Sequence, residues 1–390
     1  MPIYFIFLTA GYILSQFFRS FLPVLTSALE RDIGADAADL STAAGMWFLV
    51  FASVQIPVGA ALDKIGPKRT GSYLFAIGGG GGALIFAMAQ APWHISVAMG
   101  LIGIGCSPVL MSAYYILARD YPASRFAFFA ALILAVGQSG LLVGSLPMAL
   151  LVEVAGWRVS MLGMAVTALL VAFGIHRTVK DPPPVEGAPV ASIWEVLGIR
   201  AVWPVYVLML VSYAPAGGLR GLWAGPYFAE TFGADARVIG LVTLIMSLAM
   251  IGGALFFGPA DRILGTRKWI NFTAVSVSAM FLAVMALSPP SSFWVATAIF
   301  ACIGFSLNVY AMIMAHGRAF FPAHMVGRGV SIINFCAMGG VGLSQFATGQ
   351  IYRAAEATPG TDPFTAIFTF YVCAQILGLV VYLLVQDRTD

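Results

Sequence analysis

The sequence has very few charged residues for its length. Only 9% of its 390 residues are Asp, Glu, Lys or Arg, whereas 60% are hydrophobic and the mean hydropathy is +0.92. A soluble domain has about 25% charged residues, so this chain lacks the polar surface that water requires. Its apolar runs are long and do not alternate as the strands of a β-barrel do, which favours spanning helices. We therefore expect an all-α membrane protein.

The patterns of catalytic and metal-binding sites are also missing. The four cysteines all lie in apolar runs and have neither disulfide nor zinc-site spacing. There is no nucleophile–base constellation and no nucleotide motif. The first apolar run lacks the basic start and the cleavage site of a signal peptide, so we interpret it as a retained helix. We expect no enzymatic activity, no cofactor, no resident metal and no nucleic-acid partner.

Twelve apolar runs approach the roughly 20 residues that a membrane span needs. They cover residues 3–26, 42–62, 70–90, 93–117, 126–151, 157–176, 202–229, 237–258, 269–288, 292–316, 327–350 and 364–385. A polar, proline-rich stretch separates the sixth run from the seventh. This pattern predicts an N-terminal six-helix bundle, a cytoplasmic linker and a C-terminal six-helix bundle, over residues 1–177, 178–200 and 201–390.

The distribution of Lys and Arg predicts the orientation. Fourteen of them fall on the same side as the loop at residues 59–69, and only four outside the spans fall on the opposite side. Basic residues collect on the cytoplasmic side of membrane proteins. We therefore expect both termini in the cytoplasm of a multi-pass protein of the cell inner membrane.

The loop Gly59-Ala-Ala-Leu-Asp-Lys-Ile-Gly66-Pro-Lys-Arg69 has a weaker copy half a chain later, Gly258-Pro-Ala-Asp-Arg-Ile-Leu-Gly265-Thr-Arg-Lys268. The two copies are 199 positions apart (258 − 59 and 265 − 66). Such a fixed offset indicates an internal duplication. Two parallel six-helix halves predict a substrate site at their interface near the membrane midplane.

The first copy resembles the signature loop of the major facilitator superfamily, Gly-x-Leu-Ala-Asp-Arg-x-Gly-Arg-Arg. Here Leu62 is displaced by one position, Lys64 stands for the arginine, and Pro67-Lys68-Arg69 replaces the basic end. The resemblance covers the whole chain through twelve spans, the linker and the duplicated loop. It implies two pseudo-symmetric bundles that rock about a small-molecule substrate in the bilayer, in a protein that works as a monomer.

The resemblance also implies that Asp63 faces a helix start and an arginine in the other half. A carboxylate near a helix N-terminus gains about 0.3–1 kcal/mol from the helix dipole, and such a contact can break when the access state changes. The alternative is that the loop charges only set the topology. The predicted gating residues are Gly59, Asp63, Gly66, Lys68, Arg69, Asp261 and Arg262.

Two arginines lie inside spans, Arg19 in the first and Arg220 in the seventh, whereas none of the seventeen acidic residues falls in the middle of a span. A buried arginine usually faces a bundle interior or a watery cavity, and its planar fork matches a carboxylate or phosphate. The pair resembles the organophosphate/phosphate, oxalate/formate and nitrate/nitrite branches of the superfamily. One departure is that the offset places Arg19 opposite Gly218. Alternatively, one arginine caps helix carbonyls or lies in the outer interface.

Neighbouring polar and aromatic residues complete the predicted substrate site. Helical spacing places some of them on the faces of the two arginines, and the family resemblance places the others at the cavity. The full predicted set is Arg19, Arg220, Gln16, Tyr114, Tyr115, Tyr213, Trp223, Asn308 and Tyr310.

The coupling and the cargo stay open at this point. A proton could use His316, which is otherwise an interfacial or packing residue, or it could move with a protonated acid; exchange against a counter-substrate is also possible. An exporter of drug-like or neutral compounds is the main alternative. A copper importer using Met246, Met250, Met312 and His316 is another, as is a nontransporting receptor or assembly factor for a metal centre.

The loop analysis predicts the effect of one substitution. Asp63→Asn removes the charge that the helix dipole attracts, so we expect reduced transport with largely unchanged expression. Uptake by the purified variant in proteoliposomes, compared with wild type at equal protein density, measures this. Full transport by the variant would show that the carboxylate only marks topology.

Overall fold

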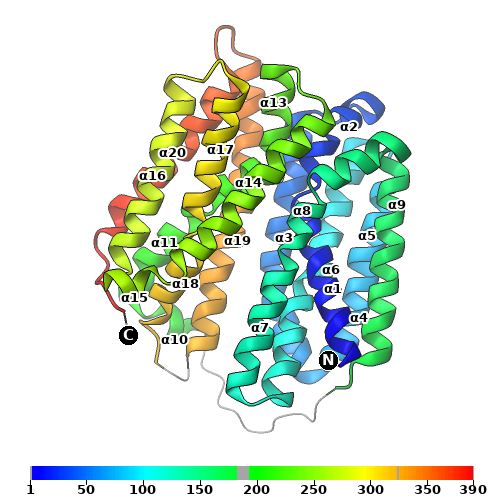
Figure 1. Cartoon of the computed structure of the whole chain (residues 1–390), viewed down its shortest axis with the longest axis vertical. Helices are drawn as coiled ribbons and strands as arrows, with labels where there is room; N and C mark the ends of the chain where they lie inside the picture. Colours follow the sequence, from blue (N-terminus) through cyan, green and yellow to red (C-terminus); the bar gives the residue numbers. More distant parts are fainter. Residues whose placement is uncertain (1, 182–192, 323–324, 390) are drawn as a thin grey trace. The chain divides into compact units, whose positions relative to one another are not determined.

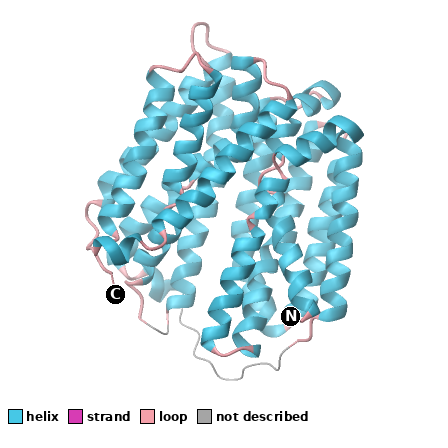
Figure 2. Ribbon diagram, viewed as in Figure 1, coloured by secondary structure: helices cyan, strands magenta, loops and turns pink. Residues whose placement is uncertain are grey.

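We describe a computed structural model of the chain, which covers residues 2–181, 193–322 and 325–389. All regular elements of this part are helices joined by loops and turns (Figure 2). The prediction of an all-α protein is therefore confirmed. Long helices coloured in sequence order can be followed from the blue N-terminus to the red C-terminal helix (Figure 1).

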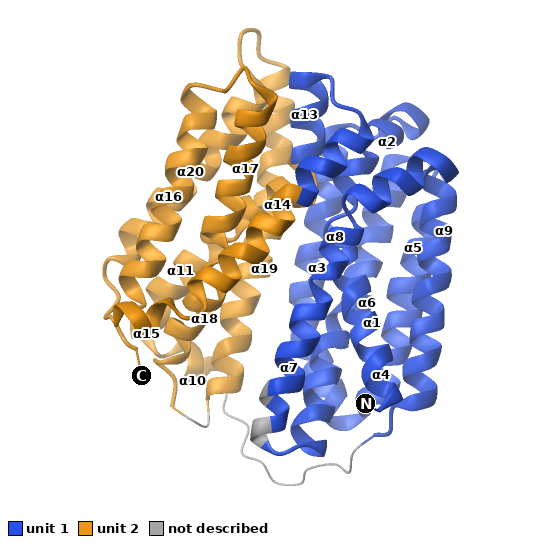
Figure 3. Cartoon of the chain, viewed as in Figure 1, with its two compact units in different colours: residues 1–188, 224–244 blue, residues 189–223, 245–390 orange. Residues whose placement is uncertain are grey.

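The contacts divide the chain into two compact units (Figure 3). Unit 1 comprises residues 1–188 and 224–244, and unit 2 comprises residues 189–223 and 245–390. Residues 224–244 pack with unit 1 although they follow the predicted linker, for instance where Gly225 approaches the carbonyl oxygen of Pro23. The division into bundles at residues 178–200 stays a prediction, and residues 182–192 of that linker lie outside the described part.

Unit 1 contains twelve complete elements and the beginning of a thirteenth. They are α1 (Ile3–Phe17), η1 (Leu22–Leu25), α2 (Thr26–Ile33), α3 (Ala37–Lys64), α4 (Pro67–Leu74), η2 (Phe75–Gly81), α5 (Gly82–Ala87), α6 (Pro92–Asp120), α7 (Ala123–Gly137), α8 (Ser139–Val143) and α9 (Leu146–Thr178), together with α13 (Ala224–Phe232) and the start of α14 (Ala236–Phe257).

Unit 2 contains the rest of α14 and eleven further elements. These are α10 (Ile193–Leu197), η3 (Arg200–Val202), α11 (Trp203–Ser212), α12 (Ala214–Gly218), η4 (Leu219–Trp223), α15 (Ala260–Leu264), α16 (Lys268–Leu287), α17 (Phe293–Leu307), α18 (Tyr310–Arg318), α19 (Val326–Glu356) and α20 (Pro363–Tyr382).

Ten helical stretches of the described chain are long and apolar enough to cross a membrane, or eleven with one bent pair counted as a span. The bent pair is the first predicted span, which turns by 54° between α1 and the segment Leu22–Ile33. The fifth predicted span, 126–151, is divided among α7, α8 and the first turns of α9. Gly156 then reverses the chain inside α9 with φ +77° and ψ 159°, so the twelve predicted spans all have helical counterparts.

The backbone repeats the offset that the sequence predicted. Gly66 and Gly265 both adopt positive φ, +98° and +66°, and Gly34 and Gly233 do the same at +67° and +64°. These are conformations that residues with a Cβ rarely adopt. The duplicated loops therefore both place a glycine with positive φ at the equivalent position, although ψ is 158° at Gly66 and 19° at Gly265.

Each unit closes its signature loop with an aspartate from beyond its last long helix. In unit 1 the Lys68 backbone N–H donates to Asp181 Oδ1 at 2.7 Å, at the first turn of α4. In unit 2 the Arg267 and Lys268 N–H groups donate to Asp387 Oδ1 at 3.1 and 2.9 Å, at the start of α16. Both carboxylates thus satisfy N–H groups that the helix leaves without partners.

Hydrogen bonding also sets the ionisation of Asp387. Partial burial favours the neutral form of this carboxyl group and raises its pKa. The hydrogen bonds that it accepts from the Thr266 hydroxyl and from the N–H groups of Lys268 and Arg267 favour the ionised form. Together they outweigh the effect of burial, so the pKa of Asp387 lies below its ordinary value. The contribution of the Asp387 carboxylate to the free energy of unfolding is therefore complete above the ordinary pKa of about 3.9. It is lost as the pH falls through the lower pKa of the folded state.

These caps predict a paired effect on stability. Asp181→Ala and Asp387→Ala each remove the acceptor at a helix start, so we expect each to lower the free energy of unfolding by about 1 kcal/mol at pH 7. Thermal unfolding in detergent measures the loss, which for Asp387→Ala should shrink as the pH falls below about 4. The matched control is Glu356→Ala, because Glu356 is exposed at the end of α19. Equal melting temperatures for all three variants would contradict the capping role.

Candidate solute-binding site

In unit 1 the candidate site is built around Arg19, at the break of the first span. The α-helical pattern ends at Phe17, and tight turns follow in which the Arg19 and Ser20 N–H groups donate to Gln16 and Phe17. The half-buried Arg19 side chain therefore leaves the chain where the helix is interrupted. Discontinuous helices are common at the solute sites of transporters, because their backbone polar groups can face a cavity.

Two aromatic rings from α3 hold the guanidinium. The Arg19 Cζ lies 4.9 Å from the ring centroids of both Trp47 and Phe51. These residues are one helical turn apart, and their rings stack at 4.9 Å with an interplanar angle of 12°. Cation–π contacts contribute about 0.5–2 kcal/mol each, depending on desolvation. They stabilise the positive charge without giving its N–H groups an acceptor.

Close packing of α6 against α3 fixes the aromatic wall. A Cβ on Gly103 of α6 would lie 2.6 Å from the carbonyl oxygen of Trp47. Only glycine permits this approach, which places Trp47 and Phe51 at a rigid contact between two long helices. Trp47 is fully buried and Phe51 is 6% exposed.

The site contains buried donors that lack acceptors. Among the described residues, neither Arg19 Nε nor Trp47 Nε1 has a hydrogen-bond partner. No ion pair joins Arg19 to a carboxylate in the described part of the chain. Guanidinium and indole groups can only donate, so this part of unit 1 lacks an acceptor. The sequence analysis missed Trp47, because a tryptophan in an apolar run does not differ from an ordinary packing residue.

The other predicted residues of unit 1 have partners inside the unit. The buried Gln16 donates through Nε2 to the Tyr12 hydroxyl at 3.0 Å. Tyr114 packs edge-on against Phe126 at 6.1 Å, and Tyr115 lies under Arg119 at 3.9 Å. The contacts recorded for the described residues do not bring Tyr114 or Tyr115 to Arg19. Their place in a solute site stays a prediction.

In unit 2 the second arginine also lies at an irregular turn. Arg220 is 1% exposed and belongs to η4, a π-helical turn between α12 and α13. A π-helical turn contains more residues than an α-helical turn and often marks a functional site.

Aromatic and amide side chains cluster at two helix breaks of unit 2. Tyr213, between α11 and α12, lies 5.2 Å from the ring of Tyr310, which begins α18. The Tyr310 hydroxyl donates to Asn334 Oδ1 at 2.5 Å, and Asn308 Nδ2 donates to the carbonyl oxygen of Met250. All four polar residues are partly exposed. The structure therefore brings Tyr213 and Tyr310 together, as members of one polar cluster with Asn334.

Trp223 packs inside unit 2 instead. It is 1% exposed, donates through Nε1 to the Thr348 hydroxyl at 3.0 Å, and lies 5.4 Å from the ring of Tyr352. Its only hydrogen-bond donor is thus used within the protein. These contacts give Trp223 a structural role in the packing of η4 against α19.

The predicted gating residues of the first loop divide into those that contact Asp181 and those that do not. Gly66 makes a tight turn where a Cβ would lie 2.5 Å from Asp181, and the Lys68 N–H donates to that aspartate. In the second group Gly59 is half-buried, and Asp63 and Arg69 are exposed.

In the second copy the ion pair differs from the expected partners. Asp261 Oδ2 accepts from Arg267 Nε at 2.9 Å, with both side chains about 15% exposed, while Arg262 is exposed. Arg267 therefore joins the loop as a residue that the sequence comparison did not single out.

The structure gives the copper hypothesis no open ligand at His316. Both ring nitrogens lie at hydrogen-bond distance from other groups, Nδ1 from the Tyr382 hydroxyl and Nε2 from the Gln386 carbonyl. Met246 and Met250 pack against Gly304 of α17. Among the described residues no group of three or more His, Cys, Asp or Glu side chains could hold a metal ion.

These features define a multi-pass membrane transporter rather than an enzyme. A family model described as Major Facilitator Superfamily matches residues 8–345, so the chain belongs to that superfamily. The signature loop and its repeat thus correctly indicated the family.

Solved structures of transporters share the fold. A mutant of the nucleoside transporter NupG matches with a TM-score of 0.76 at 12% identity, over 97% of this chain and 99% of that one. A D-xylose-proton symporter matches with a TM-score of 0.75 at 13% identity, over 97% and 96%. A bacterial homologue of the human lysosomal transporter Spinster matches with a TM-score of 0.73 at 15% identity, over 97% of this chain and 95% of that one. No curated protein matches the chain. At these identities the likeness concerns the fold alone, and the anion-transporting branches are not among these three.

Proposed function

We propose that the protein is a secondary transporter that moves a small anion, bearing a carboxylate or phosphate, across the inner membrane by alternating access. The observation that supports this most is the pair of donors in unit 1. Arg19 Nε and Trp47 Nε1 are both buried from solvent, and neither has an acceptor in the described chain. An unsatisfied buried donor costs about 1–3 kcal/mol, and an oxyanion can accept from both.

The charge separates an anion from a neutral solute. A sugar or nucleoside hydroxyl can also accept hydrogen bonds, but it leaves the guanidinium charge without compensation. A carboxylate or phosphate supplies the acceptor and the opposite charge together, in short charge-assisted bonds. Arg220 is likewise buried, 1% exposed in unit 2, and an anion matches its charge. We propose that each unit supplies one arginine to the transport pathway.

We extend the proposal to the loops and the topology. The basic residues of Gly59–Arg69 and its copy would lie in the cytoplasm with both termini. Asp63 and Arg69 are exposed in unit 1, and Arg262 is exposed in unit 2, so these charges are accessible for contacts that change with the access state. The proposed transporter works as a monomer, and a proton or a counter-substrate drives the solute.

Ligand binding by the purified protein tests the anionic cargo. A thermal-shift screen would compare mono- and dicarboxylates, inorganic phosphate and phosphomonoesters with xylose, uridine, hydrophobic drugs and Cu(I). We expect stabilisation by one anion class, and binding of that anion about 10- to 100-fold weaker in Arg19→Gln and in Arg220→Gln. Arg177→Gln is the matched control, because Arg177 also lies over an aromatic ring, that of Phe173 at 5.1 Å, but is exposed.

The outcomes of this screen are distinct. Stabilisation by neutral solutes alone, with Arg19→Gln still binding them, would refute the anionic cargo and leave a transporter of another substrate class. Equal losses in all three arginine variants, including the control, would indicate a general effect of charge. Both variants must first show the wild-type elution profile in detergent, so that misfolding is not read as lost binding.

A second prediction concerns the indole. Trp47→Phe keeps an aromatic ring under Arg19 but removes the Nε1 donor, so we expect about tenfold weaker anion binding with little change in melting temperature without ligand. Phe51→Leu is the converse variant, because it removes a ring and no donor, and it should affect binding less. Unchanged affinity in Trp47→Phe would show that the indole donor does not contact the solute.

A further inference from the structure

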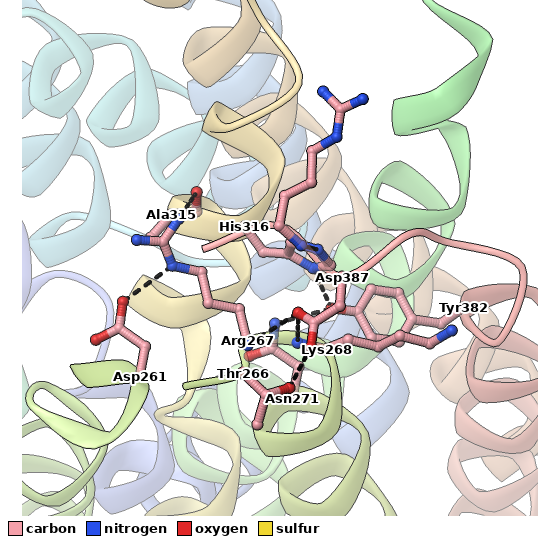
Figure 4. A network of polar contacts seen from close by, with 10 residues as sticks. Asp261, Thr266, Arg267, Lys268, Asn271, Ala315, His316, Tyr382 and Asp387 are labelled. Carbon is pink, nitrogen blue, oxygen red and sulfur yellow. Dashed lines mark hydrogen bonds and ion pairs between the residues drawn. The ribbon is translucent and has the colours of Figure 1, made fainter. Parts of the chain in front are cut away.

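A second polar cluster lies in unit 2, away from the breaks at Tyr213 and Arg220. It joins the last turn of α18, the start of α16 and the end of α20 (Figure 4). Its centre consists of His316, Tyr382 and Asn271, and all three side chains are fully buried. A histidine with no exposed surface requires an explanation, because its ordinary pKa lies close to neutral pH and burial penalises its charged form.

The hydrogen bonds define the neutral form of the ring. His316 Nε2 lies 3.0 Å from the Gln386 carbonyl oxygen, which can only accept, so the ring proton is on Nε2. The Arg388 backbone N–H also points at Nε2, at 3.4 Å, but this contact is longer than the 3.0 Å bond to Gln386, which decides the tautomer. Nδ1 then accepts from the Tyr382 hydroxyl at 2.6 Å, and the Tyr382 oxygen accepts from Asn271 Nδ2 at 2.9 Å.

This network has one acceptor to spare. Asn271 Oδ1 is buried and has no hydrogen-bond partner in the described part of the chain. If a proton binds Nδ1, that nitrogen becomes a donor to the Tyr382 oxygen. The Tyr382 O–H must then turn to another acceptor, and rotation of the Asn271 amide brings Oδ1 to it. The Nε2–H, the Nδ1–H and the Tyr382 O–H then each have an acceptor, and the Asn271 Nδ2 group takes the place that Oδ1 leaves.

The charged groups around the cluster are held by other partners. The start of α16 presents Lys268, whose ammonium donates to the Leu383 and Val385 carbonyl oxygens at 2.7 and 2.8 Å. Arg267 pairs with Asp261. From the segment after α20, Asp387 caps the start of α16, and the Arg388 guanidinium lies over the Phe320 ring at 4.6 Å.

The remaining neighbours of this turn are apolar. Val205 of α11 and Ile333 of α19 lie against Gly317, the next residue. The ring of Phe320 is 5.5 Å from the ring of His316. No carboxylate contacts the imidazole directly among the described residues. The charged groups whose fields reach the ring are Asp387, Arg267 and Lys268.

We propose that His316 is a reversible proton-binding site, with Tyr382 and Asn271 as the groups that reorient to accept the proton. Through Gln386 the site contacts the segment that ends in the Asp387 cap, so its protonation state is linked to the closure of the second signature loop. The proposal does not depend on which solute is transported. A proton bound here makes the transport cycle sensitive to pH without any carboxylate in the middle of a span.

Nitrogen NMR of histidine tests the site in the full-length protein. The chain contains four histidines. A variant that combines His94→Gln, His176→Gln and His324→Gln keeps His316 as the single nitrogen-15-labelled histidine. In detergent micelles we expect the Nε2–H tautomer at alkaline pH and a transition to the doubly protonated ring between about pH 5 and 8. A ring that stays neutral down to the pH of unfolding would overturn the proposal.

The relay is tested by changing the spare acceptor. Asn271→Leu removes Oδ1. We expect the midpoint of the His316 transition to move down by at least about one pH unit, which is a tenfold higher proton concentration. Asn271→Asp supplies a stronger acceptor and should shift the transition the other way. Asn334→Leu is the matched control, because Asn334 is a unit 2 amide bonded to the hydroxyl of Tyr310. The same midpoint in wild type and Asn271→Leu would show that Asn271 does not take part, and would refute the relay.

Discussion

In a bilayer a polar group has no water to turn to, so each donor and each charge needs a partner from the chain or from a solute. This constraint accounts for most of the irregular features described above. Where the first and seventh spans contain an arginine, the helix is interrupted by turns or a π-helical turn. Where α4 and α16 begin, an aspartate from far along the chain accepts their N–H groups. Arg19 Nε and Trp47 Nε1 of unit 1 are exceptions among the described residues, and the proposed anion site rests on them.

The two halves share a positive-φ glycine and an aspartate cap at the signature loop, but they differ in the polar contacts around it. Gly66 and Gly265 keep their positive φ, and both loops keep an aspartate cap. The polar contact beside each cap has diverged, however. In unit 1 the Ser72 hydroxyl lies 3.2 Å from His176 Nδ1, whereas in unit 2 the corresponding helices join through Asn271 and Tyr382 and involve a buried histidine from α18. The two halves thus share a scaffold, and unit 2 has acquired an additional titratable group.

Sequence reasoning reached the features that depend on local pattern. Apolar runs located the spans, the fixed offset located the repeated loop, and the rarity of charge identified Arg19 and Arg220. It missed contacts that only the tertiary structure creates. Trp47 stood in an apolar run like any packing residue, and Asp181 and Asp387 looked like ordinary charges beyond a helix end. Helical spacing also suggested Trp223 for the solute site; its indole donates to Thr348, and its place in that site stays a prediction. Spacing along a helix gives a face, but it does not show what that face meets.

The aspartate caps have a consequence for the order in which the chain can assemble during synthesis. Lys68 and Asp181 are 113 residues apart, and Lys268 and Asp387 are 119 apart. As the chain leaves the ribosome from its N-terminus, the start of α4 is made long before its acceptor, and four further spans must enter the bilayer before the bond can form. The same delay recurs for α16. Each half therefore closes late, when its final residues arrive, and until its aspartate is made the first N–H groups of α4 or α16 lack that acceptor.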